Sequence, residues 1–139
     1  MSASPELDDV KVHVKIKISA LWASVMFCYI YGDYFGLYTP GTLQDMLSGK
    51  TGFLGTQGGL LGTSAMMAIP SVMVFLSLVL KPRLNRWLNI SLGAIYTLIM
   101  MVTMPGAWGF YIFLGIIEIV LTVLIVWLAW KWPKHAGQP

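Results

Sequence analysis

The sequence predicts an all-helical membrane protein, a four-transmembrane-helix up-down bundle with a short interfacial helix after the first span. Hydrophobic residues make up 57% of the 139 residues and charged residues only 11%, whereas soluble domains carry about 25% charged residues. The apolar residues fall into four long blocks, and most charged residues lie between or beside them. The length suits one compact unit, so we expect a single transmembrane domain over residues 1–139.

The four apolar blocks cover about residues 16–38, 58–80, 87–104 and 107–130. A helix needs about 20 residues to cross the hydrocarbon core of a bilayer, and the third block is the shortest but still within range. Each block must be helical because every backbone polar group in lipid has to be bonded internally. Pro70 falls in the middle of the second block, where it removes a helical hydrogen bond and predicts a kink.

The loop after the first block is long and contains a helix signal over about residues 40–48. Thr39 suits the capping position, Pro40 the first helical position, and Gly49 the position after the helix end. Three apolar side chains of this segment would share one face: Leu43, Met46 and Leu47. We expect this helix to lie on the outer membrane surface, either as a lid over a site or as an inert spacer.

Residues 10–18 alternate between apolar and polar side chains, which is the period of a β-strand. One interpretation is a short strand, or an arm that lies on anionic lipid. The other is a solvated lead-in whose lysines anchor the first helix at the membrane surface.

The basic residues indicate the orientation of the spans. Eight of the nine lie before the first block, between the second and third, or after the fourth: Lys11, Lys15, Lys17, Lys81, Arg83, Arg86, Lys131 and Lys134. Lys50 alone lies in the first loop. Because basic residues favour the cytoplasmic side, we expect both termini there. Five tryptophans near the predicted span ends fit interfacial positions: Trp22, Trp87, Trp108, Trp130 and Trp132.

Two acids fall inside the predicted spans, Asp33 in the first and Glu118 in the fourth. A charge near the bilayer centre costs about 2.5–3.5 kcal/mol on insertion scales, so such residues are candidates for function. A rise of about 1.5 Å per residue puts Glu118 roughly at the midplane and Asp33 about 8 Å below the outer surface. The vertical gap between them is roughly 8 Å, which a tyrosine hydroxyl or a water molecule can bridge.

Four further polar residues are predicted near the two acids. Tyr29 lies one turn before Asp33, Tyr96 reaches the midplane on the third span, and Tyr111 and Thr122 share a stripe with Glu118. All six are candidate residues for binding a proton or a ligand. The alternative is that the acids make structural hydrogen bonds between helices.

Small residues recur every four positions along the first span, at Ala20, Ser24, Cys28, Gly32 and Gly36. Such a stripe permits close approach of two helices. It favours either packing inside one bundle or the seam of a homo-oligomer.

No catalytic, metal or cofactor site is predicted. The histidines, His13 and His135, lie outside the spans, which disfavours a haem between the helices. No lysine lies in a span centre, no cluster has metal-ligand spacing, and no nucleophile with its base can be assembled at one depth. We therefore expect neither an enzyme nor a nucleic-acid-binding protein, and the expected partners are the lipid bilayer and other membrane helices.

Several segments resemble a family of small bacterial four-helix membrane proteins of unassigned function. The resemblance rests on residues 18–22, 31–35, 69–70, 76–77 and 118–119, with Met73, and above all on the sequence Asn-Arg-Trp-Leu-Asn-Ile at 85–90. It covers most of the chain, supports the four-span topology, and implies a bacterial plasma-membrane protein. It implies no activity.

Three functions remain open. The first is a small transporter or channel-like oligomer in which Glu118 and Asp33 handle protons or a cationic solute. The second is an accessory or assembly subunit of a larger membrane complex, motivated by the small-residue stripe. The third and weakest is a lipid or quinone binder, motivated by nine methionines and the tyrosines.

Overall fold

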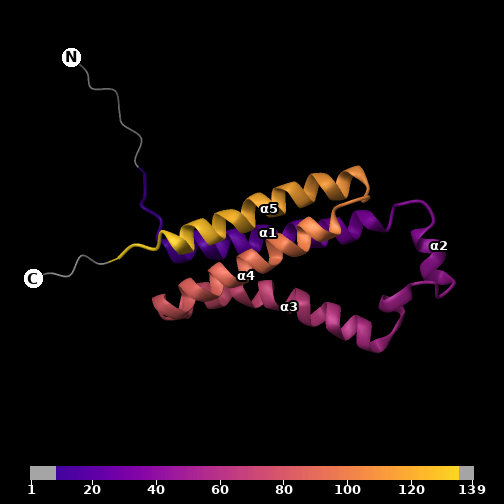
Figure 1. Ribbon diagram of the computed structural model, residues 1–139, viewed down its shortest axis with the longest axis horizontal. Helices are drawn as coiled ribbons and strands as arrows, with labels where there is room; N and C mark the ends of the chain where they lie inside the picture. The colour runs from indigo at the N-terminus through magenta and orange to yellow at the C-terminus, as the bar shows by residue number, and fades with distance from the viewer. Residues whose placement is uncertain (1–8, 135–139) are drawn as a thin grey trace, which may run out of the picture.

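The computed structural model describes residues 9–134, which form helices and no strands (Figure 1). The elements are α1 (Val14–Gly36), α2 (Thr42–Leu47), the short 3-10 helix η1 (Gly52–Gly55), α3 (Gln57–Val79), α4 (Pro82–Thr103) and α5 (Gly109–Trp130). Four of these helices, α1, α3, α4 and α5, are long and apolar enough to cross a membrane. The predicted all-helical fold class, with four helices able to cross a membrane, is therefore confirmed. His135 lies outside the described residues.

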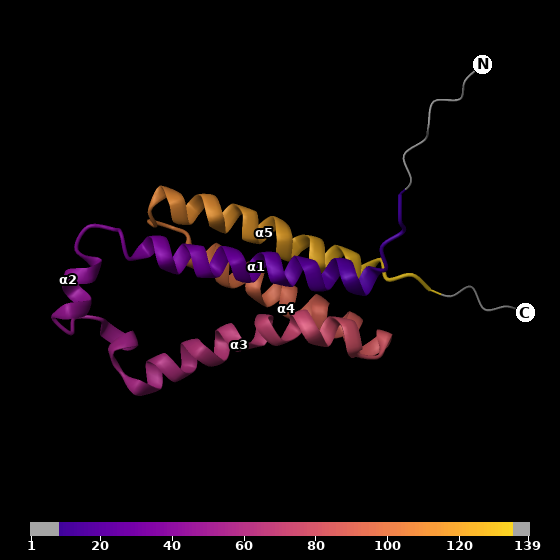
Figure 2. The same cartoon turned by 180° about the vertical axis from the view of Figure 1, so that it is seen from behind.

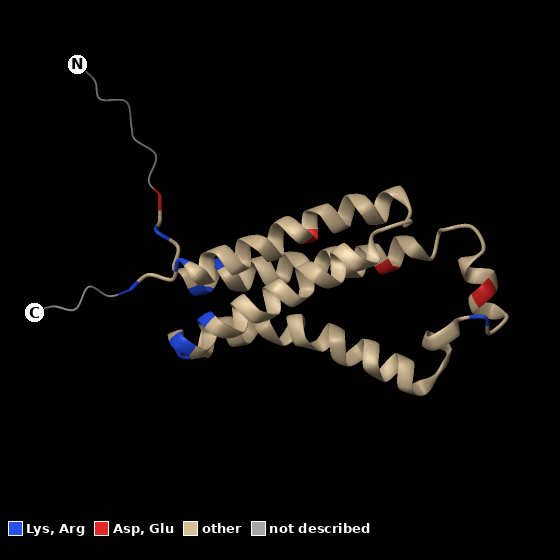
Figure 3. Cartoon of the chain, viewed as in Figure 1, with Lys and Arg blue, Asp and Glu red and all other residues tan. Residues whose placement is uncertain are grey.

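The four long helices pack unequally. Helix α1 packs against α5 and α3, and α5 also packs against α4, whereas α3 and α4 touch each other little. We call the end of the bundle near the chain termini the basic end, because lysines and arginines gather there, and the opposite end the loop end (Figure 3). Figure 2 shows α3 diverging from α1 toward the loop end.

Helix α1 begins at Val14, so the strand interpretation of residues 10–18 is wrong from Val14 onward. The Nδ1 atom of His13 accepts a hydrogen bond from the backbone N–H of Lys15 at 3.2 Å, which caps the helix start. The ammonium group of Lys15 donates to the carbonyl oxygens of Leu78 at 3.1 Å and Leu80 at 2.8 Å. These carbonyls lie at the carboxyl end of α3, where a positive charge is stabilising.

Helix α4 begins at Pro82, earlier than the predicted start at residue 87, and has 22 residues. Proline is well suited to the first position of a helix because it has no N–H to leave unpaired. The arginines expected in a loop therefore belong to the helix. Arg86 donates from Nε to the carbonyl oxygen of Ala129 at 3.2 Å and from Nη2 to that of Trp130 at 3.3 Å, which caps α5.

The predicted surface helix is present as α2, but its start differs from the prediction. Gly41, with φ of 88°, precedes the helix, and the hydroxyl of Thr39 donates to the carbonyl oxygen of Gly36 instead of capping α2. Thr39 and Pro40 thus belong to the turn that follows α1. Gly49 follows the helix with φ of 73°, as expected for a glycine stop. No residue of α2 is buried.

A buried polar network holds the basic-end half of the bundle together, and we call it the asparagine network: Trp22, Ser77, Asn85 and Asn89. The Oδ1 atom of Asn89 accepts from Trp22 Nε1 at 2.7 Å and from Ser77 Oγ at 3.4 Å. The amide of Asn89 donates to Asn85 Oδ1 at 2.6 Å, and that of Asn85 donates to the Ser77 carbonyl at 2.6 Å. All four residues have 0% exposure, so direct hydrogen bonds in the interior join α1, α3 and α4.

A close helix crossing lies on α4 at Gly93. A Cβ atom there would lie 2.7 Å from Val126 Cγ2 on α5, which is too close for a real side chain. On the predicted stripe of α1, a Cβ at Gly32 would make only an ordinary contact with Leu114, at 3.8 Å. Ala20 and Ser24 of the same stripe are exposed. Gly32 in the stripe therefore does not require the absence of a side chain as Gly93 does, and the seam between copies stays a prediction.

Candidate functional site

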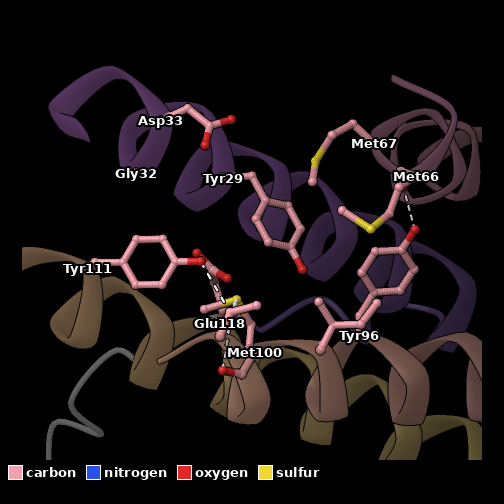
Figure 4. A pocket seen from close by; sticks show the side chains of 11 residues that line it. Tyr29, Gly32, Asp33, Met66, Met67, Tyr96, Met100, Tyr111 and Glu118 are labelled. Atoms are coloured by element: carbon pink, nitrogen blue, oxygen red, sulfur yellow. Dashed lines mark hydrogen bonds between the residues drawn. The ribbon is translucent and has the colours of Figure 1, made fainter. Parts of the chain in front are cut away.

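A cavity of about 100 Å³ lies among α1, α3, α4 and α5 in the loop-end half of the bundle (Figure 4). Five of the six candidate residues from the sequence line it: Tyr29, Asp33, Tyr96, Tyr111 and Glu118. The rest of the wall includes the thioethers of Met66, Met67 and Met100. Residues from four helices therefore meet at one site, as the estimated depths of the acids and tyrosines predicted.

Two buried polar atoms of this cavity have no hydrogen-bond partner within the described chain. One is Oε2 of Glu118, whose residue is only 2% exposed, and the other is the hydroxyl of Tyr29. Most buried polar groups in proteins are hydrogen-bonded, and each exception calls for an explanation. Glu118 comes from α5 and Tyr29 from α1, so the cavity collects unpaired oxygens from two helices.

Asp33 differs from Glu118 in its exposure. Its side chain is exposed on the bundle surface but also lines the cavity. Figure 4 shows it across the cavity from Glu118, on the same helix as Tyr29. The site thus has one carboxyl group at its edge and one in its interior.

Tyr96 performs a structural task at the cavity wall. Pro70 is buried inside α3 and lacks an N–H, so the carbonyl of Met66, four residues earlier, loses its helical partner. The hydroxyl of Tyr96 donates to that carbonyl instead (Figure 4). Helix α3 changes direction near its middle, in keeping with the predicted kink (Figure 2). This bond links α3 to α4 at a place where the two helices otherwise touch little.

Thr122 does not line the cavity. Its hydroxyl is fully buried, shares a hydrogen bond of 2.7 Å with the hydroxyl of Thr97, and donates to the backbone carbonyl of Glu118 at 2.9 Å. Tyr111 lines the cavity and donates to Thr103 Oγ1 at 3.3 Å. Thr122 is therefore a structural link between α4 and α5, although sequence spacing placed it beside the acid.

Sequence reasoning missed the three methionines and Thr103 in the wall of the cavity. One signal was available for Met66. It lies four residues before Pro70, which has no N–H to donate to the Met66 carbonyl. That carbonyl therefore needs a donor from another helix. The other methionines carry no such signal, because methionine is a common filler of irregular gaps.

The size and composition of the cavity limit what it can bind. About 100 Å³ is room for several water molecules or a small cation, since one water needs only about 10–15 Å³ on this measure. Drug-sized ligands occupy pockets of about 300–1,000 Å³. Within the described residues, no group of three or more His, Cys, Asp or Glu side chains is placed to hold a metal ion.

Four long apolar helices around a small cavity define a small multi-span helical membrane protein with a carboxyl group in its interior. The chain belongs to a family of unknown function, DUF6326, whose model matches residues 7–137. The resemblance to a family without an assigned function is thereby confirmed. No curated protein and no solved structure matches the chain.

Proposed function

We propose that this protein binds and transports protons or a small cation, with Glu118 as the central binding group and Asp33 at the access to the site. One observation carries the proposal. The carboxyl group of Glu118 is buried, has an unpaired oxygen, and faces a cavity that it shares with the unpaired hydroxyl of Tyr29.

The pairing of other buried polar groups supports a binding role for Glu118. Thr122 and Asn89, which link helices, use their side chains in hydrogen bonds to other elements. A carboxyl kept only for helix packing would be paired in the same way, because an unpaired buried group costs about 1–3 kcal/mol. A cation, a proton or water in the cavity would supply the missing partner.

The cavity volume supports a small solute over a large one. An apolar cavity that binds benzene measures about 150 Å³, whereas this cavity measures about 100 Å³. A quinone ring or a multidrug substrate exceeds that space. Protons, hydrated protons and small monovalent cations fit it.

We further propose that the protein lies in a bacterial plasma membrane with its basic end in the cytoplasm. The argument is the charge distribution, because eight of the nine basic residues lie at one end. In that orientation Asp33, in the last turn of α1 at the loop end, lies on the outer side of Glu118, which is near the middle of α5. The fully buried asparagine network lies between the cavity and the basic end, so passage requires a second arrangement of the helices.

The test is proton flux into liposomes that contain the purified protein. The flux is followed with a pH-sensitive dye, both without and with a gradient of a small cation. Wild-type protein is expected to give a flux above that of empty liposomes, and Glu118→Gln should reduce it at least about tenfold because the exchangeable carboxyl is gone. Asp45→Asn is the matched control, since it removes an acid from α2, outside the spans. Unchanged flux in Glu118→Gln, or no flux from wild-type protein, contradicts the proposal.

A further inference from the structure

A hollow of about 410 Å³ lies at the basic end, between the start of α4 and the segment that follows α5. Three basic side chains line it, Arg83, Arg86 and Lys134, together with the indole rings of Trp87 and Trp132. None of its lining residues is acidic. It lies away from the cavity of Glu118, and the proposed transport does not use it.

Arg86 is held in a fixed position in this hollow. Its Nε and Nη2 atoms donate to carbonyl oxygens of α5, and its guanidinium carbon lies 5.9 Å from the ring centre of Trp87 and 5.8 Å from that of Trp130. A guanidinium group has five N–H donors. The donors that α5 does not occupy remain for a ligand, and they are already oriented.

Arg83 lies one turn before Arg86 on the same helix face, and its side chain makes no hydrogen bond within residues 9–134. Two like charges at this spacing repel each other, and no carboxylate in the hollow offsets them. A tetrahedral anion with several oxygens would relieve the repulsion and accept bonds from both groups, because guanidinium groups match phosphate in shape.

The position of the hollow points to a lipid phosphate. Pro82, at the start of the apolar helix α4, also lines it, and the tryptophans around it are the residues that favour the headgroup level of a bilayer. We propose that this hollow, lined by Arg83, Arg86, Lys134, Trp87 and Trp132, binds the phosphate of an anionic phospholipid. Basic pockets between membrane helices on the cytoplasmic side suit such headgroups.

The experiment titrates purified protein in neutral detergent with phosphatidylglycerol or phosphatidylcholine and counts bound lipids by native mass spectrometry. Wild-type protein is expected to bind phosphatidylglycerol at least about fivefold more tightly than phosphatidylcholine. Arg83→Gln should weaken phosphatidylglycerol binding about fivefold, the effect of one basic group near an anionic surface. Arg83→Lys should recover only part of it, because lysine cannot bond in a bidentate manner.

Lys11→Gln is the matched control, because it removes one positive charge at the same end from an exposed residue that does not line the hollow. It should leave phosphatidylglycerol binding unchanged. Equal losses in Arg83→Gln and Lys11→Gln would overturn the site and indicate a diffuse surface charge. Tighter binding of inorganic phosphate than of phosphatidylglycerol to wild-type protein would overturn the lipid as ligand and indicate free phosphate.

Discussion

The two halves of the bundle treat buried polar groups in opposite ways. In the basic-end half, the side chains of the asparagine network are bonded to one another and to the backbone of α3 and α4. In the loop-end half, Glu118 and Tyr29 each keep a buried oxygen unpaired beside a cavity. The buried polar residues of the spans therefore form two groups, those that pair with one another and those left unpaired beside the cavity.

The attachment of α3 follows the same division. At the basic end, Lys15 and Asn85 donate to the carbonyls of its last turn and of Ser77. Toward the loop end α3 diverges from α1 beyond its bend (Figure 2), and Tyr96 bonds it to α4 at Met66. A helix anchored at one end and diverging at the other is suited to open the cavity, as the proposed transport requires.

The largest expected effect comes from breaking the asparagine network with Asn89→Leu. The change leaves the N–H of Trp22 without its acceptor and Oδ1 of Asn85 without its donor, and each such group costs about 1–3 kcal/mol. We expect the free energy of unfolding to fall by about 3 kcal/mol, measured by denaturant titration in mixed micelles. Ser91→Leu, an exposed change on the same helix, is the control and should have little effect. Equal stability of the two variants would contradict the assigned role of the network.

A smaller effect is expected at the boundary between the halves. Tyr96→Phe removes the donor to the Met66 carbonyl and should destabilise the protein by about 1–2 kcal/mol in the same titration. Pro70→Ala restores a helical N–H for that carbonyl, so the double variant should recover most of the loss. If Pro70→Ala brings no recovery, the Tyr96 bond does not substitute for the missing helical bond.

The sequence predicted most of the fold because long apolar runs in a membrane protein have few alternatives to helices. It placed the start of α4 too late, because a block chosen by hydropathy omits a polar first turn that begins with Pro82 and carries Arg83 and Arg86. It also missed the glycine start of α2, where Gly41 takes a positive φ.

The candidate site was predictable in part. Asp33, Glu118 and the three tyrosines all fall in the loop-end half of their helices, and depth along a helix follows from sequence position alone. Thr122 was misplaced because spacing gives the face of one helix but not the partner on the next, and Thr97 occupies its hydroxyl. The asparagine network could not be predicted for the same reason, because the bond from Trp22 to Asn89 joins residues 67 positions apart on different helices.

The unpaired state of Glu118 is the central claim, and the free energy of unfolding of Glu118→Gln tests it most directly. A carboxyl that makes no structural hydrogen bond should be replaceable by an amide of the same shape with a change below about 1 kcal/mol. The account predicts this small effect together with the loss of flux. A loss of about 2 kcal/mol or more, approaching that of Asn89→Leu, would mean that Glu118 links helices as the asparagines do.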